Sequence, residues 1–339
     1  MSGAMMQAAV AEAPGAPLVI GERAVPKPAA GEVLVRVAAA GLNPLDAKIR
    51  AGQAGHAKQP LPAVLGIDMA GTVVTVGEGV TAWQPGDEVF GMVGGVGARQ
   101  GTLAAFVAAD ARLLARRPAA LSAREAAVLP LIAITAWEGL IDRAQVRAGQ
   151  RVLVQGGAGG VGHIVVQLAR SRGAEVWATG RAWQAQAIKL LGARFIDAAE
   201  GAPAYAAATN GEGFDIVFDT LGGAVLDASF QAVRRYTGHV VSILGWGSHS
   251  LAPLSFRGAT YSGVFTLLPL LTGEGLAHHG QILAEVAKLA EAGRLRPHLD
   301  ARAFSLTDTE AAYAWMAGGQ ARGKIAVDVA VDVAADVAA

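Results

Sequence analysis

The most restrictive feature of the sequence is a cluster of five glycines within residues 156–162. The segment before it, VLVQ, is apolar and rich in valine, which favours a buried strand. The segment after it places Val161, Val165 and Leu168 on one face of a predicted helix. Because glycine adopts backbone conformations that other residues avoid, the cluster predicts a tight turn between that strand and that helix.

This turn also matches a phosphate-binding pattern, since residues 157–162 read G-x-G-x-x-G. In the pattern Gly157 makes the tight turn, Gly159 lets the backbone approach a diphosphate, and Gly162 allows the helix to pack closely on the strand. The N–H groups at the helix start, around Gly160 and Val161, then point at the diphosphate. The segment therefore predicts a dinucleotide site; the other interpretation is an ordinary strand-to-helix turn without a ligand.

The next predicted strand, EVWATG at 175–180, indicates which dinucleotide is bound. Folds that select NAD carry Asp or Glu at the end of this strand, on the ribose hydroxyls. Here the strand ends at Arg181, whose guanidinium can pair with a 2′-phosphate, so the sequence favours NADP. An arginine merely solvated on a loop is the other interpretation, and the following Trp183-Gln184-Ala185 supplies no second basic residue.

The pattern along the chain indicates two domains. The first third has short strand-like runs separated by turn sequences such as GEG and QPGD, which predicts a compact β-rich domain. From Arg151 onward apolar strand-like runs alternate with helical segments, which is typical of a doubly wound α/β domain with a parallel sheet. An amphipathic helix at 280–295 and strand-like pieces at 301–306 and 323–329 predict a return of the chain to the first domain.

Composition narrows the possible partners. The 28 basic and 28 acidic residues balance, which argues against a general electrostatic grip on nucleic acid or on an anionic membrane. There is no cysteine, which excludes disulfides, thiolate zinc sites and a cysteine nucleophile. The first residues do not resemble a secretory signal and the apolar stretches are short, so we expect a soluble, cytoplasmic protein with a small-molecule partner. The last nine residues, VDVAADVAA, are expected to form a frayed tail.

Several stretches, taken together and in order, resemble the medium-chain dehydrogenase/reductase superfamily, and within it the zinc-independent quinone oxidoreductase branch, whose relatives include enoyl reductases. They are AAGLNPLDAKIRAG, LPAVLGIDMAGTVVTVGEGVTAWQPGDEVFG, LSAREAAVLPLIAITAWEGL, GQRVLVQGGAGGVGHIVVQLAR and GKIAVDV. The resemblance implies a GroES-like catalytic domain from residues 1–127 and 267–339, with a Rossmann NADP-binding domain at 128–266 inserted between its parts. It also implies a nicotinamide in the cleft between the domains and a homodimer built through the Rossmann domains.

Zinc-dependent members of that superfamily hold a catalytic metal with Cys, His and a further Cys or acid. Here the region of the first ligand reads Gly41-Leu42-Asn43, and the family's G-H-E reads Gly66-Ile67-Asp68. Because the cysteine and histidine ligands are both missing, these departures predict that no metal is bound.

The resemblance assigns residues of the first domain and of the following helix to the active site. Asn43 and Asp46 match an N-x-x-D element beside the nicotinamide, and Thr135 matches a threonine that packs there. Asn43 would offer its amide to the carboxamide, a water or the substrate oxygen, whereas Asp46 would fix the local backbone. Lys48 stands where some quinone reductases have a tyrosine, and it is a candidate proton donor. A turn asparagine and a core threonine are the alternative interpretations of Asn43 and Thr135.

Further cofactor contacts are implied at two later positions. Ser242, Leu244 and Gly245 end a predicted strand whose carboxyl end should face the nicotinamide, where open α/β sheets bind ligands. Lys324, in the C-terminal GK, would reach a cofactor phosphate or the substrate mouth, unless it is a solvated surface lysine.

The predicted function is that of a zinc-free, NADPH-dependent reductase of quinones or conjugated carbonyl compounds such as enones and acrylates. In such an enzyme the cofactor carries the chemistry, so the lack of an obvious acid–base pair is tolerable. Two alternatives remain: an NADPH-binding structural or regulatory protein with little turnover, and a zinc-type alcohol dehydrogenase.

Overall fold

The computed structural model describes residues 4–329 and divides into two compact units. Unit 1 combines the chain up to Leu131 with the chain from Leu267 onward, and unit 2 is Ile132–Thr266. The predicted terminal tail at 331–339 lies outside the described residues. In the part of the chain that is described, no helix is long and apolar enough to cross a membrane.

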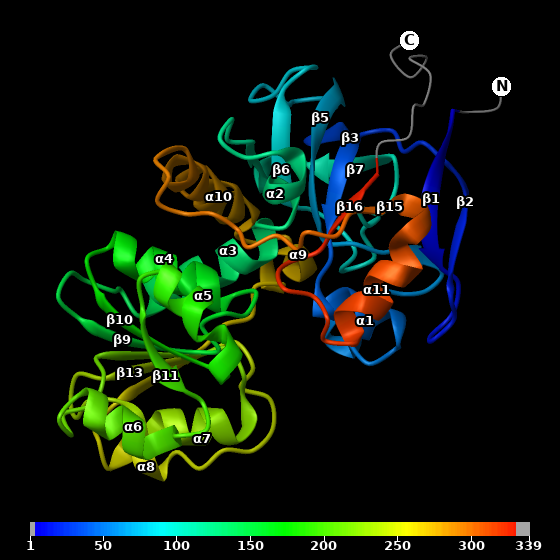
Figure 1. Cartoon of the computed structure of the whole chain (residues 1–339). Coiled ribbons are helices and arrows are strands. Elements are labelled where there is room, and N and C mark those ends of the chain that lie inside the picture. The colour runs from blue at the N-terminus through cyan, green and yellow to red at the C-terminus, as the bar shows by residue number, and fades with distance from the viewer. Residues whose placement is uncertain (1–3, 330–339) are drawn as a thin grey trace. The chain divides into compact units, whose positions relative to one another are not determined.

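Unit 2 is built on a six-stranded sheet in which all neighbouring strands are parallel (Figure 1). Its strands are β9 (Arg151–Gln155), β10 (Glu175–Gly180), β11 (Arg194–Asp197), β12 (Ile216–Asp219), β13 (His239–Ser242) and β14 (Thr260–Gly263). Their spatial order is β11-β10-β9-β12-β13-β14, which is the doubly wound order that reverses between β9 and β12. The predicted Rossmann topology is therefore confirmed.

Helices cover both faces of this sheet. They are α4 (Gly162–Ser171), α5 (Ala185–Leu190), α6 (Gly201–Ala208), α7 (Gly223–Ala232) and α8 (Ala252–Ser255), with a π-helical segment at Glu138–Arg143. Helices α4 and α5 lie on one face, next to β9, β10 and β11. On the other face α6, α7 and α8 enclose an apolar core formed by residues such as Leu153, Val217, Phe230 and Leu254. Burial on both faces explains why the strands have continuous apolar runs.

Unit 1 consists mainly of two sheets. The smaller contains β2 (Leu18–Ala24), β1 (Met5–Ala11) and β4 (Ala63–Val64). The larger follows the order β15 (Phe304–Ser305), β16 (Ala326–Asp328), β3 (Glu32–Gly41), β5 (Asp68–Val76), β6 (Glu88–Met92) and β8 (Leu114–Arg116), with β7 (Phe106–Asp110) also on β3. Strand β16 pairs antiparallel with the last residues of β3, so the C-terminal segment returns to the first part of the chain.

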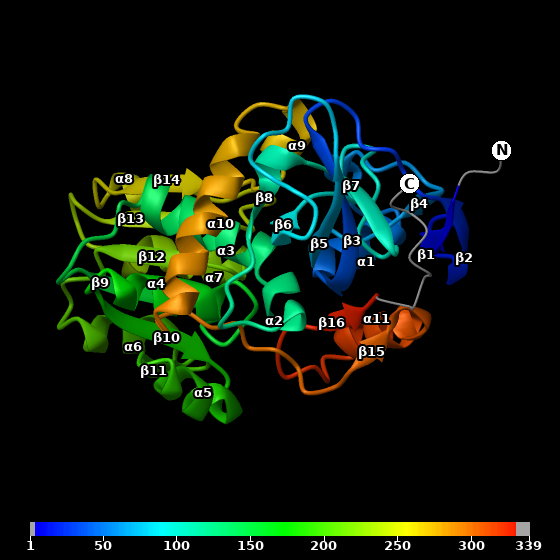
Figure 2. The same cartoon turned by 90° about the horizontal axis from the view of Figure 1, so that it is seen from above.

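The helices of unit 1 connect and cover these sheets. They are α1 (Pro44–Arg50), α2 (Ala123–Ala127), α9 (Leu268–Thr272), α10 (Leu276–Glu291) and α11 (Thr309–Ala317), with α3 (Pro130–Trp137) starting at the unit boundary. Figure 2 shows α11 beside β15 and β16. Helix α2 begins with a capping box, in which Ser122 and Glu125 exchange hydrogen bonds between side chain and backbone. The GroES-like unit and the Rossmann unit together confirm the predicted fold class.

Candidate active site

The glycine turn joins β9 to α4 as the sequence predicts. Gly157 and Gly162 are buried, and a Cβ at either would lie 2.4 Å from Ala178 Cβ or 2.1 Å from the Gly156 carbonyl oxygen, respectively. A Cβ at Gly159 would meet only the Gly156 oxygen, at 3.1 Å, and Gly159 and Gly160 are both exposed. Two glycines are therefore required by the turn's own packing, whereas Gly159 leaves the backbone surface of the turn open.

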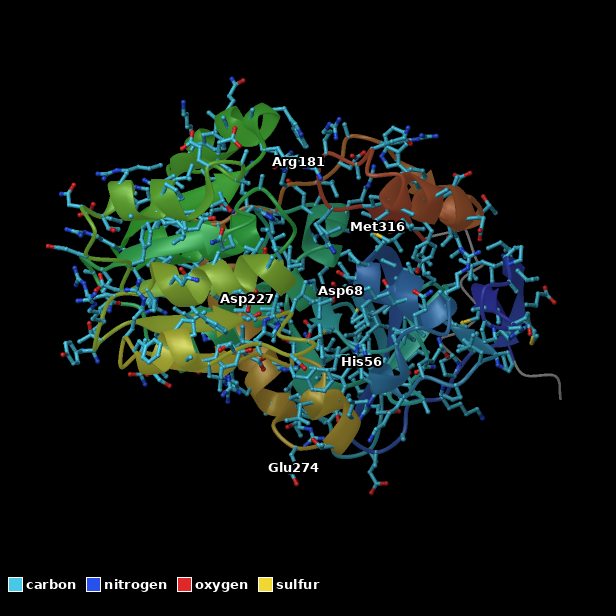
Figure 3. All side chains as sticks on the ribbon, turned by 90° about the horizontal axis from the view of Figure 1, so that it is seen from below. His56, Asp68, Arg181, Asp227, Glu274 and Met316 are labelled. Atoms are coloured by element: carbon cyan, nitrogen blue, oxygen red, sulfur yellow. The ribbon has the colours of Figure 1, made fainter. Side chains whose placement is uncertain are left out.

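The same edge of the sheet carries Arg181. The Gly157 N–H donates to the Thr179 carbonyl at 2.9 Å, so the end of β10 lies against the glycine turn. Arg181 follows β10 directly, has an exposed side chain (Figure 3), and its backbone N–H donates to Gln184 Oε1 at 2.9 Å. Val161, the last turn residue before α4, is half-buried. The glycine turn and Arg181 thus lie at the same edge of the sheet.

The carboxyl end of β13 is held by a buried carboxylate. Ser242 Oγ donates to Asp219 Oδ2 at 2.7 Å and accepts from the Leu244 N–H at 3.1 Å. The Asp219 carboxylate also accepts the N–H groups of Leu221 and Gly222 at 3.0–3.1 Å. The Ser242 hydroxyl is therefore engaged in fixing the loop that presents Leu244. Sequence reasoning missed Asp219, although an acid at the end of an apolar strand was a visible signal.

Gly245 follows in the same loop and packs against β14. A Cβ there would lie 2.2 Å from the Tyr261 hydroxyl, so only glycine fits without movement of the tyrosine.

Thr135 lies elsewhere in unit 2, in α3. It is 7% exposed, and its hydroxyl is 2.9 Å from that of Thr266, which in turn donates to Glu138 at 3.2 Å. The structure thus gives Thr135 a hydroxyl partner in its own unit.

Unit 1 holds a buried polar cluster around Asn43, at the corner between β3 and α1. Asn43 Nδ2 donates to Asp68 Oδ2 at 2.9 Å and faces the Gly41 carbonyl at 3.5 Å. Lys324 Nζ donates to the Leu42 carbonyl at 2.7 Å and to Asn43 Oδ1. Asn43, Asp68 and Lys324 are each at most 7% exposed. Lys324 is therefore a buried lysine engaged with Asn43, rather than a solvated surface residue.

Asp46 completes the cluster from the first turn of α1. Its Oδ2 accepts the Asn43 N–H at 2.8 Å, as in a capping box. Within residues 4–329, its Oδ1 is buried and has no hydrogen-bond partner, and the same holds for the hydroxyl of Tyr313 on α11. Lys48, by contrast, is exposed on α1, outside this cluster.

Burial controls the charges in this cluster. It raises the pKa of Asp46 to about 7 and that of Asp68 to about 7, and it lowers the pKa of Lys324, against the pull of the two aspartates. The two acids differ in how many of their carboxylate oxygens accept hydrogen bonds. Both oxygens of Asp68 accept N–H groups, from Asn43 and from Leu131 at 2.9 Å, which favours its ionised form. Asp46 has one oxygen without a donor among the described residues, so hydrogen bonds oppose its protonation less than that of Asp68.

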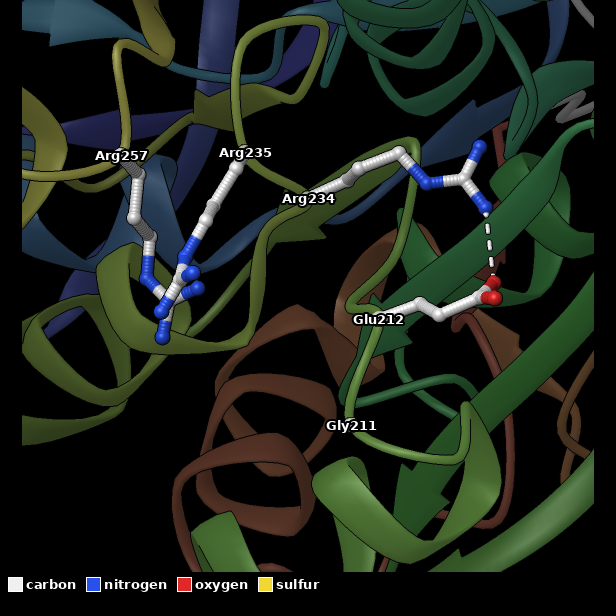
Figure 4. Close-up of a pocket in the computed structure, with 5 residues that line it drawn as sticks. All are labelled: Gly211, Glu212, Arg234, Arg235 and Arg257. Carbon is white, nitrogen blue, oxygen red and sulfur yellow. Dashed lines mark hydrogen bonds and ion pairs between the residues drawn. The ribbon is translucent and has the colours of Figure 1, made fainter.

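Two hollows in the described residues are lined by none of the predicted site residues. One of about 440 Å³ is lined by Gly211, Glu212, Arg234, Arg235 and Arg257, which precede β12, β13 and β14 at the amino edge of the sheet. Figure 4 shows Arg234 directed to Glu212, a contact of 3.2 Å. Another of about 530 Å³ lies in unit 1 and is lined by Ile49, Gly52, Ala54, Gly55, Lys58, Gln59, Pro60 and Ala98. Within residues 4–329 no group of three His, Cys, Asp or Glu side chains is arranged to hold a metal ion.

Comparison with known proteins extends these observations over most of the chain. Residues 29–119 match the alcohol dehydrogenase GroES-like domain, and residues 191–327 match a domain described as zinc-binding dehydrogenase. The chain is 34% identical to 2-methylene-furan-3-one reductase of Solanum lycopersicum over 90% of its own length and 73% of that protein. It is 33% identical to the chloroplastic NADPH-dependent alkenal/one oxidoreductase of Arabidopsis thaliana, over 89% and 73% respectively.

A solved structure is also similar. An alcohol dehydrogenase superfamily protein from Novosphingobium aromaticivorans is 57% identical, with a TM-score of 0.94 over 96% of this chain and 100% of that one. The chain therefore belongs to the medium-chain dehydrogenase/reductase superfamily of oxidoreductases, among the relatives of quinone and enone oxidoreductases.

Proposed function

We propose that the protein is a zinc-free, NADPH-dependent reductase of conjugated carbonyl compounds or quinones. The observation that carries the proposal is the carboxyl edge of the unit 2 sheet. There the open backbone at Gly159 and the exposed guanidinium after β10 offer both a diphosphate site and a 2′-phosphate site. The relatives' names, one an NADPH-dependent alkenal/one oxidoreductase and one a furanone reductase, support the same substrate class.

The residues of unit 2 would bind and orient the cofactor. The glycine turn and the first N–H groups of α4 bind the diphosphate, and Arg181 pairs with the 2′-phosphate. Asp219 and Ser242 hold the loop with Leu244 and Gly245 in place for the nicotinamide end. When bound, the cofactor supplies the hydride that reduces the electron-poor carbon of the substrate.

The residues of unit 1 would stabilise the oxygen that gains negative charge. The Asn43 side-chain amide donates a short hydrogen bond to Asp68, whereas its 3.5 Å contact to the Gly41 carbonyl is at the limit of a hydrogen bond. The second amide N–H is therefore the one that a developing enolate or quinol oxygen can attract. Lys324 fixes the orientation of this amide, since Asn43 Oδ1 accepts from Nζ. The proton comes from water or from the exposed Lys48.

A cofactor-binding protein without turnover is the other candidate, because nothing in the glycine turn requires catalysis. The experiment that separates the two is steady-state oxidation of NADPH with a panel of quinones, enones and 2-substituted acrylates. The proposal expects turnover with at least one class, and equal turnover after treatment of the protein with a chelator. Tight NADPH binding without turnover across the panel favours the structural role, and activity lost on chelation contradicts the zinc-free assignment.

Cofactor selectivity is expected to depend on Arg181. A charge-assisted hydrogen bond contributes roughly 1.5–3 kcal/mol, so Arg181→Ala should weaken NADPH binding about 10- to 100-fold and leave NADH nearly unchanged. Arg194→Ala is the matched control, because that guanidinium stacks 4.6 Å from the Trp177 ring at the start of β11. Dissociation constants for both cofactors test the prediction. An equal loss for NADPH and NADH would mean that Arg181 does not contact the 2′-phosphate.

We also propose a homodimer through unit 2. Strand β14 is one of the two edge strands of the sheet, and unpaired edges are usually covered by another chain or by charged residues. Light scattering is expected to give twice the mass of the chain. A mass of one chain that does not change with concentration would contradict this proposal.

A further inference from the structure

The loop after β13, residues 243–251, is attached to the rest of unit 2 at two separate places. Its first part is fixed by Ser242 and by the fit of Gly245 against Tyr261. Its second part contains Gly247, which has a φ of 106° and carries no side chain that could attach the loop at that point. Without a further attachment, the segment beyond Gly247 would not restrain Leu244 and Gly245.

His249 supplies that attachment. Its Nδ1 lies 2.8 Å from Asp227 Oδ1, on the neighbouring helix α7. Figure 3 shows Asp227 within unit 2. The imidazole ring also packs edge-on against the buried Phe230 ring of the same helix, at a centroid distance of 6.3 Å. The His249 side chain is only 12% exposed, whereas that of Asp227 is 54% exposed.

A second contact acts in the same part of the loop. The Trp246 ring packs edge-on against Phe265 at 6.2 Å, with the planes at 90°. An aromatic contact of this kind restricts the tryptophan but carries no charge. The ion pair is therefore the one attachment of this loop segment, among the contacts described, whose strength depends on protonation.

We propose that His249 and Asp227 form a positioning pair that holds loop 243–251 against α7, so that Leu244 and Gly245 are set for the nicotinamide end of the cofactor. The inference rests on the proposed function, because it assumes that NADPH binds at this edge of the sheet. Neither residue takes part in hydride transfer. They act through the backbone of the loop, and they would make cofactor affinity sensitive to pH.

The direction of that sensitivity follows from the groups around the imidazole. Asp227 on α7 faces it directly, Asp219 at the end of β12 is the next acid, and Tyr261 of β14 packs edge-on against Phe230 at 5.7 Å. The hydrogen bond to Asp227 is the main cause that raises the pKa of His249 above its ordinary 6.5. A raised histidine pKa means that the charged pair is complete at low pH and is lost as the pH rises through that pKa.

The test compares His249→Gln and Asp227→Asn with wild-type protein, by measuring NADPH dissociation constants at intervals from pH 6 to pH 9. The 2′-phosphate titrates in this range, so the informative quantity is the ratio of variant to wild-type dissociation constants at each pH. We expect a ratio of about two to five at pH 6, falling to about one at pH 9, as the wild-type pair loses its charge. His239→Gln, at the other end of β13 and bonded to Ser262, is the control and should keep one ratio throughout.

The possible outcomes separate the two proposals. A ratio near one at every pH, in protein that binds NADPH, overturns the positioning pair and leaves the proposed function intact. A raised ratio that does not change with pH also overturns it, because that result indicates only a structural role. Wild-type protein that binds no NADPH contradicts the proposed function, and the pair with it. A proton NMR titration in which the His249 pKa falls in Asp227→Asn would support the pair independently of the cofactor.

Discussion

Asp68→Asn is expected to lower the free energy of unfolding by about 3–5 kcal/mol, which is the usual cost of leaving a buried charge without its partner. Asp68 accepts N–H groups at both oxygens, from Asn43 and from Leu131. An amide at this position would turn an N–H toward one of those donors, and Lys324 would lose the negative charge that most favours its protonated form in a buried site. Denaturant unfolding near pH 7 measures the effect.

Asp46→Asn is the matched control, because it changes the other buried acid of the same cluster. The amide oxygen can still accept the Asn43 N–H, and the NH₂ group would replace the oxygen that has no partner. We therefore expect stability at pH 7 equal to or above that of the wild type. Equal losses in the two variants would contradict the claim that the fold depends more on an ionised Asp68 than on an ionised Asp46.

The pH dependence of stability provides a second readout of the same pair. The pKa of Asp46 is raised from 3.8 to about 7, so the folded state keeps a proton that the unfolded state releases. The contribution of Asp46 to the free energy of unfolding is largest below pH 4. It decreases as the pH rises to 7, by up to about 4 kcal/mol. Asp46→Asn should remove the part of this decline that comes from Asp46 and leave the part that comes from Asp68, whose pKa is also raised to about 7. A wild-type stability that rises between pH 5 and pH 7 and is unchanged in the variant would contradict it.

Gly159→Val is expected to weaken NADPH binding by a factor of 100 or more. The valine side chain would cover the backbone surface at which the diphosphate is proposed to bind, and at least two charge-assisted hydrogen bonds of roughly 1.5–3 kcal/mol each would be lost. The fold should tolerate the change, since the added Cβ meets only the Gly156 oxygen, at 3.1 Å, and points into open space otherwise. Titration of NADPH and a melting curve, measured on one preparation, test both statements.

Gly157→Val gives the contrasting result that makes this prediction specific. Its Cβ would lie 2.4 Å from Ala178 Cβ on β10, so the variant should lose stability through overpacking. If Gly159→Val binds NADPH like the wild type, the diphosphate does not bind at this turn. If both variants lose stability equally, the claim that packing requires glycine at position 157 but not at position 159 is wrong.

Much of the fold could be predicted because it depends on local patterns. The strand before Gly156 and the helix after Gly162 follow from the spacing of apolar residues, and the start of α2 follows from the Ser122 and Glu125 pair. Continuous apolar runs also indicated strands buried on both faces. Such signals lie within a few residues of one another, so these elements can be predicted without knowledge of contacts between distant segments.

The candidate site could be predicted only as a set of positions. Asn43, Asp46 and Lys324 were assigned through the family's motifs, but the cluster that joins them was not visible, because 281 residues separate Asn43 from Lys324. Asp68 was considered only as the residue that replaces a metal ligand. The sequence does not indicate the pair of Asp227 and His249, because these residues lie on different elements, whereas Asp219 carries a local signal as an acid at the end of an apolar strand.

By itself, the sequence determined the glycine turn, the alternation of strands and helices, and the basic residue after β10, since backbone geometry and residue spacing carry these features. Only the tertiary structure decided that Lys324 is buried, that Asp68 has N–H donors at both oxygens, and that His249 contacts Asp227 on α7. The physical reason is that charge, protonation and hydrogen-bond partners depend on burial and on contacts between distant segments, which form only when the chain has folded.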